Sequence, residues 1–270
     1  FVLGAQPTIV NNVFRGNQGT VIHINANSLQ ATIHADPGRS TGAISQFVQF
    51  ADNYGPLIRL NRLQNNSVNG MEVRGAVLTT ESVWDDTDIA HVLRGEISVL
   101  NHHTFSGLHL ISSQSESLVV KLAGPNAGFT ANGTLLDIDD RIGGSIYIGT
   151  SGLPVVLTSL ADDTATAGVD LFGQPLGDTN NDGSNSAPAA GNWRGILLDR
   201  YSNDRNVSLS RESEPAFSGS VDSNRTPAQA QFLGSLAPDE KSGDVNRRLG
   251  FEVHGNISVD NTRDMDVYSF

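Results

Sequence analysis

The sequence of 270 residues contains no cysteine, which excludes a disulfide framework, a thiolate metal site and a cysteine nucleophile. Basic residues are also few, since 17 lysines and arginines face 29 aspartates and glutamates, and the formal net charge is −12. Nucleic acids and anionic lipid surfaces are bound through a basic footprint, so this balance argues against both as partners. No stretch is long and apolar enough to span a bilayer, so we expect no membrane span.

Helical periodicity is missing as well. No window keeps apolar residues at the i, i+3, i+4, i+7 spacing of an amphipathic helix. Short alternating runs such as Leu108–Leu110 and Ile146–Ile148 recur instead, bounded by Asn, Gly, Asp and Ser. The sequence therefore predicts an all-β protein.

The two ends of the chain show no terminal signals. Phe1–Gly4 includes neither an initiator Met nor a basic region of the kind that opens a signal peptide. Asp266–Phe270 stops in the middle of an alternating pattern. We expect the chain to be a piece of a longer protein.

A weak repeat precedes three of the apolar runs. The segments Asn12–Gly16, Asn66–Gly70 and His103–Gly107 each combine a polar residue, an apolar residue and a glycine. A short strand with one buried face cannot bury it alone, but stacked coils can, which predicts a parallel β-helix over roughly residues 7–210. A β-sandwich whose turns share this composition is the alternative. In the β-helix, polar residues of the turns would form hydrogen-bonded ladders, and these apolar residues would be buried: Ile22, Met71, Val73, Leu108, Leu110, Val120, Ile146 and Ile196.

An acidic loop lies between the apolar runs Val155–Leu157 and Ile196–Leu198. Four side chains with oxygen donors occupy positions 1, 3, 5 and 7 of an EF-hand-like loop, with Gly183 at position 6. A hard cation such as calcium is bound by this kind of oxygen ligand, so the loop is a candidate calcium site. The four residues are Asp178, Asn180, Asp182 and Ser184.

The loop departs from an EF-hand at position 12, where Ala189 stands in place of the bidentate glutamate. The ligand shell must then be completed from elsewhere in the chain. Asp162 and Asp163 are the nearest candidates, together with Asp170. Trp193 is expected to pack under the loop where the chain returns to the coil. The competing interpretation is a solvated turn rich in Asp and Asn, which needs no metal.

Two other acidic segments offer less chemistry. Glu81–Asp88 carries carboxylates beside a Trp. The segment could bind a cation or a sugar, or it could be a structural loop on a coil, and we favour the structural loop. Asp139–Arg141 is more simply a turn with a surface ion pair than a catalytic group, because neighbouring residues of an extended segment point to opposite faces. The histidines show no metal-ligand spacing, and His23 and His109 are expected on outer strand faces.

The acidic coil has a familiar pattern. The series PVVLTSLADDT, DTNNDG and PAAGNWRGI, within Pro154–Ile196, resembles a coil of large secreted bacterial surface proteins of the planctomycete and cyanobacterial type. That resemblance implies a right-handed parallel β-helix and an extracellular or cell-surface location, and it names no activity.

The end of the chain resembles a second family. TPAQAQFLG at Thr226–Gly234, then Phe251–Ile257 and Asp264–Phe270, are similar to the start of the bacterial pre-peptidase C-terminal domain. This resemblance implies part of a β-sandwich that is not itself catalytic. The expected organisation is a parallel β-helix over 1–209, a polar linker over 210–225 and a truncated pre-peptidase-like domain over 226–270.

These observations favour a non-catalytic extracellular module, structural or adhesive, that calcium stabilises within a large secreted or cell-surface protein. The alternative is a carbohydrate-active β-helix enzyme, a polysaccharide lyase or glycoside hydrolase, or a polysaccharide-binding module. Catalysis is left open, although no convergent set of carboxylates is legible and aromatic residues are only 6% of the chain. Expected partners are a polysaccharide, other surface proteins or further copies of the chain.

Overall fold

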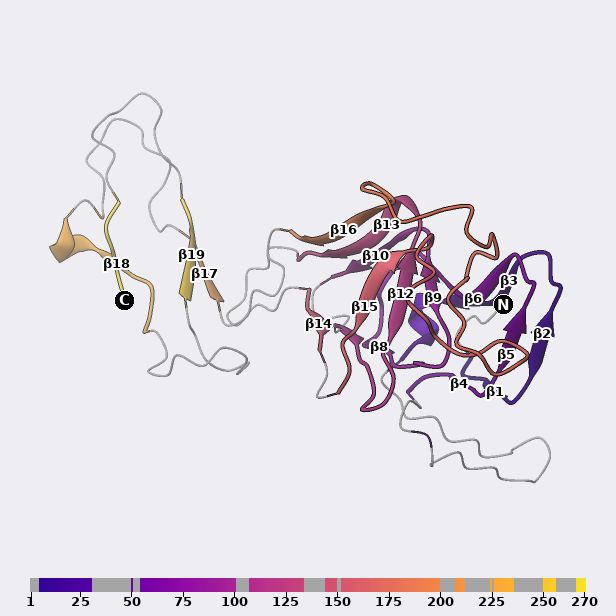
Figure 1. The fold of residues 1–270 in the computed structure, drawn as a ribbon. Helices are drawn as coiled ribbons and strands as arrows, with labels where there is room; N and C mark the ends of the chain where they lie inside the picture. Colours follow the sequence, from indigo (N-terminus) through magenta and orange to yellow (C-terminus); the bar gives the residue numbers. More distant parts are fainter. Residues whose placement is uncertain are drawn as a thin grey trace, which may run out of the picture.

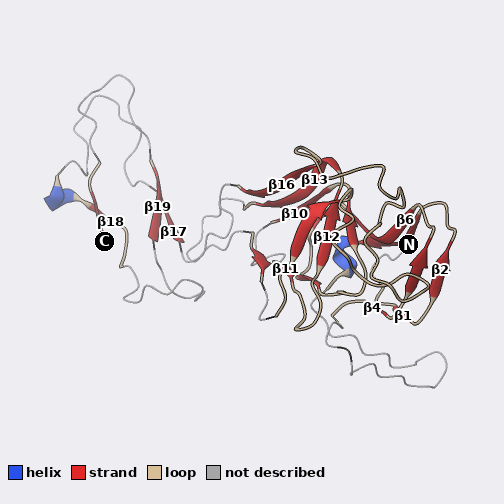
Figure 2. Cartoon of the chain, viewed as in Figure 1, coloured by secondary structure: helices blue, strands red, loops and turns tan. Residues whose placement is uncertain are grey.

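The structure is a computed structural model that describes residues 5–30, 50, 54–100, 107–133, 144–149, 152–199, 207–211, 224, 226–235, 250–255 and 266–270. Strands and loops dominate these residues (Figure 2). Within the described part of the chain, helical structure is limited to two short 3₁₀ turns, η1 (Ala26–Ser28) and η2 (Pro227–Gln229). The expectation of an all-β protein is confirmed.

Three parallel sheets form the main body (Figure 1). The first sheet contains, in spatial order, β15 (Val156–Ser159), β12 (Val119–Leu122), β9 (His91–Leu93), β6 (Val68–Arg74) and β3 (Thr20–Asn25). The second contains β16 (Trp193–Leu198), β13 (Gly124–Ala131), β10 (Glu96–Val99) and β7 (Ala76–Val77). The third contains β14 (Ile146–Ile148), β11 (Leu108–Leu110) and β8 (Ser82–Trp84).

The chain visits these sheets in a fixed cycle. It passes through the first, then the second, then the third, and each return to a sheet adds one strand beside the previous one. Parallel neighbours require such a crossover connection, because a tight hairpin can join only antiparallel strands. We call one passage around the three sheets a level. The parallel sheets are consistent with a β-helix-like fold.

The N-terminal levels carry two more parallel pairs. β1 (Thr8–Val10) pairs with β4 (Leu57–Arg59), and β2 (Val13–Arg15) pairs with β5 (Arg62–Gln64). The expected polar ladder is found in the turns that follow these strands. The amides of Asn12 and Asn61 share a hydrogen bond of 3.1 Å, and those of Asn17 and Asn66 share one of 2.7 Å.

This pairing corrects the alignment of the sequence repeat. The repeat sets Asn12 against Asn66, whereas the structure stacks Asn66 on Asn17. The repeated glycines are likewise not equivalent, since Gly16 has the same left-handed backbone as Asn65 (φ 70° and 54°) and not as Gly70. Asparagine tolerates that conformation, so Gly and Asn exchange between levels and the glycine alone was a misleading marker.

The core lies between the three sheets, where inward residues of successive levels form columns. One column is Met71, His91 and Val120, and another is Ile97 and Phe129, all fully buried. Six of the eight residues expected in the core are buried, namely Ile22, Met71, Val73, Leu108, Leu110 and Val120. Ile146 is only partly buried.

The expectation for Ile196 is wrong. Ile196 continues the column of Ile97 and Phe129 in register but is 39% exposed. It lies on β16, the last strand of the second sheet among the described residues. The sequence pattern identified an inward position correctly. It did not reveal that Ile196 lies on the last described strand of its sheet, where no further described strand covers it.

The C-terminal segment forms two short parallel pairs. β17 (Val207–Arg211) pairs with β19 (Gly250–His254), and β18 (Gln231–Phe232) pairs with β20 (Tyr268–Ser269). Antiparallel pairing is the rule in β-sandwiches. The partial sandwich over 226–270, the linker over 210–225 and their boundaries stay predictions.

Candidate metal centre

The acidic loop lies along the outer face of the first sheet. It leaves β15, runs back across β12, β9 and β6 toward β5, and returns to β16 (Figure 1). Backbone hydrogen bonds fix this path, from Leu63 N to Val169 O (3.2 Å) and from Asn69 N to Thr179 O (2.7 Å). Leu160 from the loop packs on Val68 and Val92 of the sheet. The loop therefore covers a face that a solitary coil would leave to solvent.

Lys121 on β12 is the main polar anchor of the loop. Its side chain points outward from the coil and is nevertheless fully buried, because the loop covers it. Its ammonium Nζ donates to the carbonyl oxygen of Asp162 at 2.7 Å and to that of Gly177. Desolvation by burial lowers the pKa of Lys121, and the nearby carboxylates, Asp163 first, oppose that shift.

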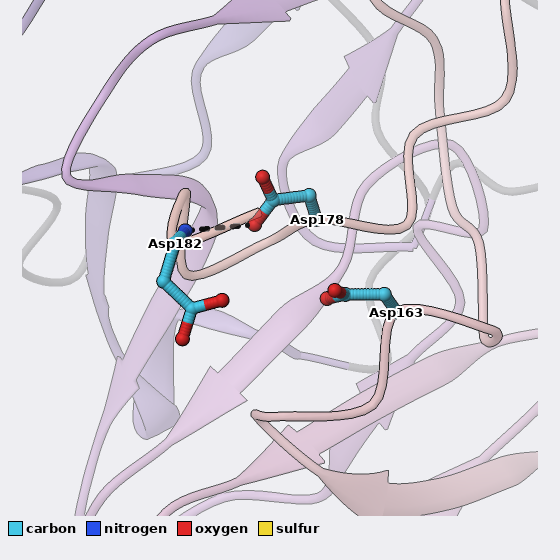
Figure 3. Close-up of side chains that lie close together, drawn as sticks. All are labelled: Asp163, Asp178 and Asp182. Atoms are coloured by element: carbon cyan, nitrogen blue, oxygen red, sulfur yellow. Dashed lines mark hydrogen bonds between the residues drawn. The ribbon is translucent and has the colours of Figure 1, made fainter. Parts of the chain in front are cut away.

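Three carboxylates converge above this lysine. One oxygen from each of Asp163, Asp178 and Asp182 lies within 4.8 Å of the others. Figure 3 shows Asp163 facing Asp178 and Asp182 from a separate segment of the loop. Oxygen ligands lie about 2.3–2.6 Å from a calcium ion and therefore within about 5 Å of one another, so three oxygens this close can contact one such ion.

A close backbone approach brings the two parts of the loop together. A Cβ atom added to Gly177 would lie only 2.0 Å from the carbonyl oxygen of Asp163. Only glycine permits this contact. The contact sets Asp163 beside Asp178, although the two are far apart in sequence.

Hydrogen bonds pre-form the Asp178–Ser184 segment. The Asp178 carboxylate accepts from Asp182 N and Gly183 N, each at 3.0 Å. Asn180 donates its amide to Asp182 Oδ2 at 2.8 Å. Asn181 and Gly183 have left-handed backbones, with φ of 54° and 65°. These contacts among the chain's own groups hold the segment in shape.

Three oxygens in this region remain without a hydrogen-bond partner among the described residues. They are Asp163 Oδ1, Asn180 Oδ1 and Asp182 Oδ1, each hidden from solvent. A buried oxygen without a donor is unfavourable, and a cation would remove that cost. Burial, and next the charge of Asp178, raises the pKa of Asp163, as expected where carboxylates crowd together.

The structure places the other residues of the predicted site differently. Asp162 accepts from the hydroxyls of Thr158 and Thr164, both at 2.6 Å, and the Thr158 hydroxyl is the main cause of its lowered pKa. Ser184 is exposed at the tip of the loop. Asp170 caps its own turn by accepting from Phe172 N. Of the two aspartates that follow β15, Asp163 is therefore the one whose carboxylate lies beside those of Asp178 and Asp182.

Sequence reasoning missed Lys121 altogether. It reads as an outward polar residue on an alternating strand, which is normally solvated. The only available signal was the length of the acidic loop, since a long ordered loop needs something to hold it. Trp193, expected under the loop, packs against the main core.

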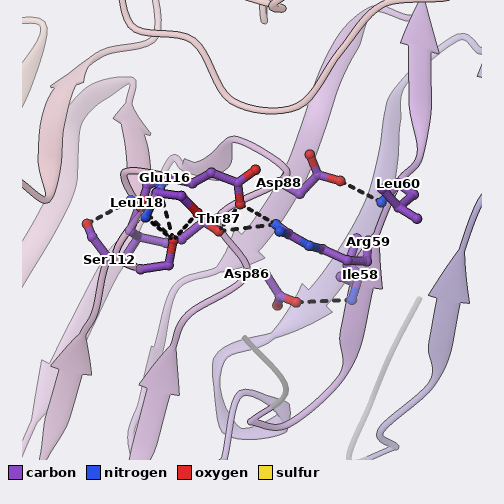
Figure 4. Close-up of polar contacts among 11 residues, drawn as sticks. Ile58, Arg59, Leu60, Asp86, Thr87, Asp88, Ser112, Glu116 and Leu118 are labelled. Carbon is purple, nitrogen blue, oxygen red and sulfur yellow. Dashed lines mark hydrogen bonds and ion pairs between the residues drawn. The ribbon is translucent and has the colours of Figure 1, made fainter. Parts of the chain in front are cut away.

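The acidic segment at Asp86 and Asp88 joins neighbouring levels (Figure 4). Asp86 Oδ1 accepts from Ile58 N at 3.1 Å, and Asp88 Oδ2 accepts from Leu60 N. The carboxylates of Asp86 and Asp88 thus accept hydrogen bonds from the N–H groups of Ile58 and Leu60 in the adjacent level. In a paired strand, backbone carbonyl groups would accept these bonds. This geometry supports the structural role that we favoured for Glu81–Asp88.

A hollow of about 370 Å³ adjoins this segment and is lined in part by Asp88 and Glu116. Glu116 accepts from the Arg59 guanidinium and from the Thr87 hydroxyl, the latter at 2.9 Å. Burial raises the pKa of Asp88. Both carboxylates are therefore engaged in holding successive levels together.

The other candidate segment, Asp139–Arg141, lies outside the described residues. Comparison with known protein families, with curated proteins and with solved structures gives no match for this chain. Within the described part of the chain, no helix has the length and apolar character needed to cross a membrane. The function must therefore be argued from the geometry of the acidic loop.

Proposed function

We propose that the chain is a non-catalytic structural or adhesive module of an extracellular or cell-surface protein, built on a right-handed parallel β-helix and stabilised by calcium. The single observation that carries the proposal is the convergence of the Asp163, Asp178 and Asp182 carboxylates on one point. Calcium bound there would join the two parts of a loop that covers the first sheet, so binding would stabilise the fold.

Charge supports one divalent cation at this point. The three aspartates carry three negative charges, and the ammonium of Lys121 beneath them offsets one. One calcium ion would balance the remainder. Because the ion binds the folded loop and not the unfolded chain, calcium should raise the melting temperature by binding linkage.

Thermal unfolding in calcium and in EDTA tests this proposal. We expect calcium to raise the melting temperature of the wild-type chain, and the Asp178→Ala, Asp182→Ala double variant to lose that rise. Asp162→Asn is the matched control, because Asp162 lies next to Asp163 but bonds to Thr158 and Thr164 instead. A calcium response that Asp162→Asn abolishes and the double variant retains would contradict the proposed site.

The alternative, a carbohydrate-active enzyme or polysaccharide-binding module, has the hollow beside Asp88 and Glu116 as its best location. The engagement of both carboxylates with backbone and arginine partners favours the structural role instead. A structural module of net charge −12 suits solubility and cation binding outside the cell. Its proposed partners are polysaccharides, other surface proteins or further copies of the chain.

A further inference from the structure

A lysine lies directly beneath the three converging carboxylates. The sequence contains only two lysines, and one of them, Lys121, is fully buried under the acidic loop. Its Nζ donates to the carbonyl oxygens of Asp162 and Gly177. These two residues immediately precede Asp163 and Asp178, which supply two of the three carboxylates. One ammonium group therefore holds the two peptide groups from which these ligands extend.

The charge of Lys121 acts on the same carboxylates. The ammonium interacts electrostatically with Asp163, Asp162 and Asp178, in that order of strength. The loop covers Lys121, so solvent screens this interaction less than it screens a pair of exposed charges. The centre thus contains a built-in positive charge close to the point where its carboxylates converge.

Such a charge affects cations unequally. It repels any cation that binds at the centre, and the repulsion grows in proportion to the charge of the ion. The repulsion is therefore half as large again for a trivalent ion as for a divalent one. Lanthanide ions resemble calcium in size and in their preference for oxygen ligands, so a comparison of the two isolates the effect of charge.

We propose that Lys121 is the residue that makes this centre select a divalent cation over a trivalent one. The proposal rests on the calcium site proposed above. The three carboxylates and the ammonium together carry two negative charges, which one divalent ion balances. Lys121 contacts the peptide groups that bear the ligands and not the ion, so it is a positioning residue whose charge sets the selectivity.

Binding of calcium and of lanthanum to the wild-type chain and to Lys121→Gln tests this proposal. Glutamine keeps an amide group that can donate to the loop carbonyls, but it carries no charge. We expect the ratio of lanthanum affinity to calcium affinity to rise at least about tenfold in Lys121→Gln. Arg74→Gln is the matched control, because it removes one positive charge from an exposed residue at the end of β6, where solvent screens it. Its ratio should equal that of the wild type.

The outcomes separate selectivity from a purely structural role. Loss of an anchor alone would weaken the binding of both ions in the same proportion, so an unchanged ratio in folded Lys121→Gln would overturn the proposal. An equal rise of the ratio in Arg74→Gln would also overturn it, because the effect would then come from net charge. Absence of calcium binding to the wild-type chain would instead overturn the proposed calcium site, and the selectivity with it.

Nitrogen-15 labelling of the two lysines provides a test that needs no substitution of Lys121. The side-chain signal of Lys241 is identified with Lys241→Arg, which leaves the signal of Lys121. We expect the ammonium signal of Lys121 to shift when the wild-type chain binds calcium, and to shift further with lanthanum. An ammonium signal that neither bound ion displaces would overturn the proposal, whether or not Lys121→Gln folds.

Discussion

The fully buried histidine of the core should make folding stability depend on pH. His91 on β9 stacks on Trp84, with ring centroids 5.4 Å apart and planes inclined by 13°. A hydrogen bond with the backbone of Ile89 stabilises the protonated ring, but its effect on the pKa of His91 is smaller than that of burial. Desolvation by burial lowers the pKa of His91 to about 3, from 6.5 in an exposed histidine.

The sign of the effect follows from this lowered pKa. Between pH 6.5 and about 3 the unfolded chain binds a proton at His91 and the folded chain does not, so stability falls as the pH falls through this range. The free energy of unfolding falls by about 1.4 kcal/mol for each pH unit below 6.5. At pH 5, about 1.5 units lower, the loss is therefore about 2 kcal/mol. Above pH 7 the contribution is constant.

Urea unfolding of the wild type and of His91→Phe at pH 7.5 and pH 5.0 measures this contribution. Phe keeps a ring to stack on Trp84 and does not titrate, so effects of the many carboxylates cancel in the comparison. The free energy of unfolding of the wild type should fall by about 2 kcal/mol more than that of the variant. His91→Leu serves as a second non-titrating variant should Phe overfill the site. Parallel pH dependence in wild type and variants would refute the reasoning.

Two further predictions concern the loop anchor and a strained turn. Lys121→Met leaves two loop carbonyls without a donor, so the free energy of unfolding should fall by about 2–5 kcal/mol in urea titrations; an unchanged midpoint would contradict the role of Lys121 as an anchor. Leu60 has a left-handed backbone (φ 57°), as does Asn11 (φ 58°) in the neighbouring level, and its side chain is 52% exposed. Asparagine tolerates this conformation better than leucine, so Leu60→Asn should raise the free energy of unfolding by about 1 kcal/mol, whereas Leu60→Ala should give little gain. A destabilised Asn variant would argue against strain at this position.

The sequence was informative where a pattern was local. Alternation in runs such as Leu108–Leu110 identified inward positions, because the side-chain period of a strand is fixed by its backbone. The acidic loop was recognisable from Asp178 and Asp182, whose spacing defines a turn. The Asn ladders followed from stacking, and only their register was misplaced because Gly and Asn exchange at left-handed turn positions.

Other features depend on contacts between distant levels, which no local pattern reports. The choice of Asp163 over Asp162 depends on the approach of Gly177 to the backbone of Asp163. The burial of Lys121 depends on the loop crossing its strand. The exposure of Ile196 depends on which strand follows it in space, and the hydrogen bonds of Asp86 and Asp88 depend on the neighbouring level.

Calorimetric titration of calcium into the metal-free chain tests the central claim most directly. We predict one bound calcium ion per chain, with binding that weakens as the pH falls because the Asp163 carboxyl, whose pKa burial raises, takes up a proton. Asp163→Asn should remove this binding, while Asp162→Asn should keep it. Absence of calcium binding to the folded wild-type chain, or binding that Asp163→Asn leaves unchanged, would contradict the account.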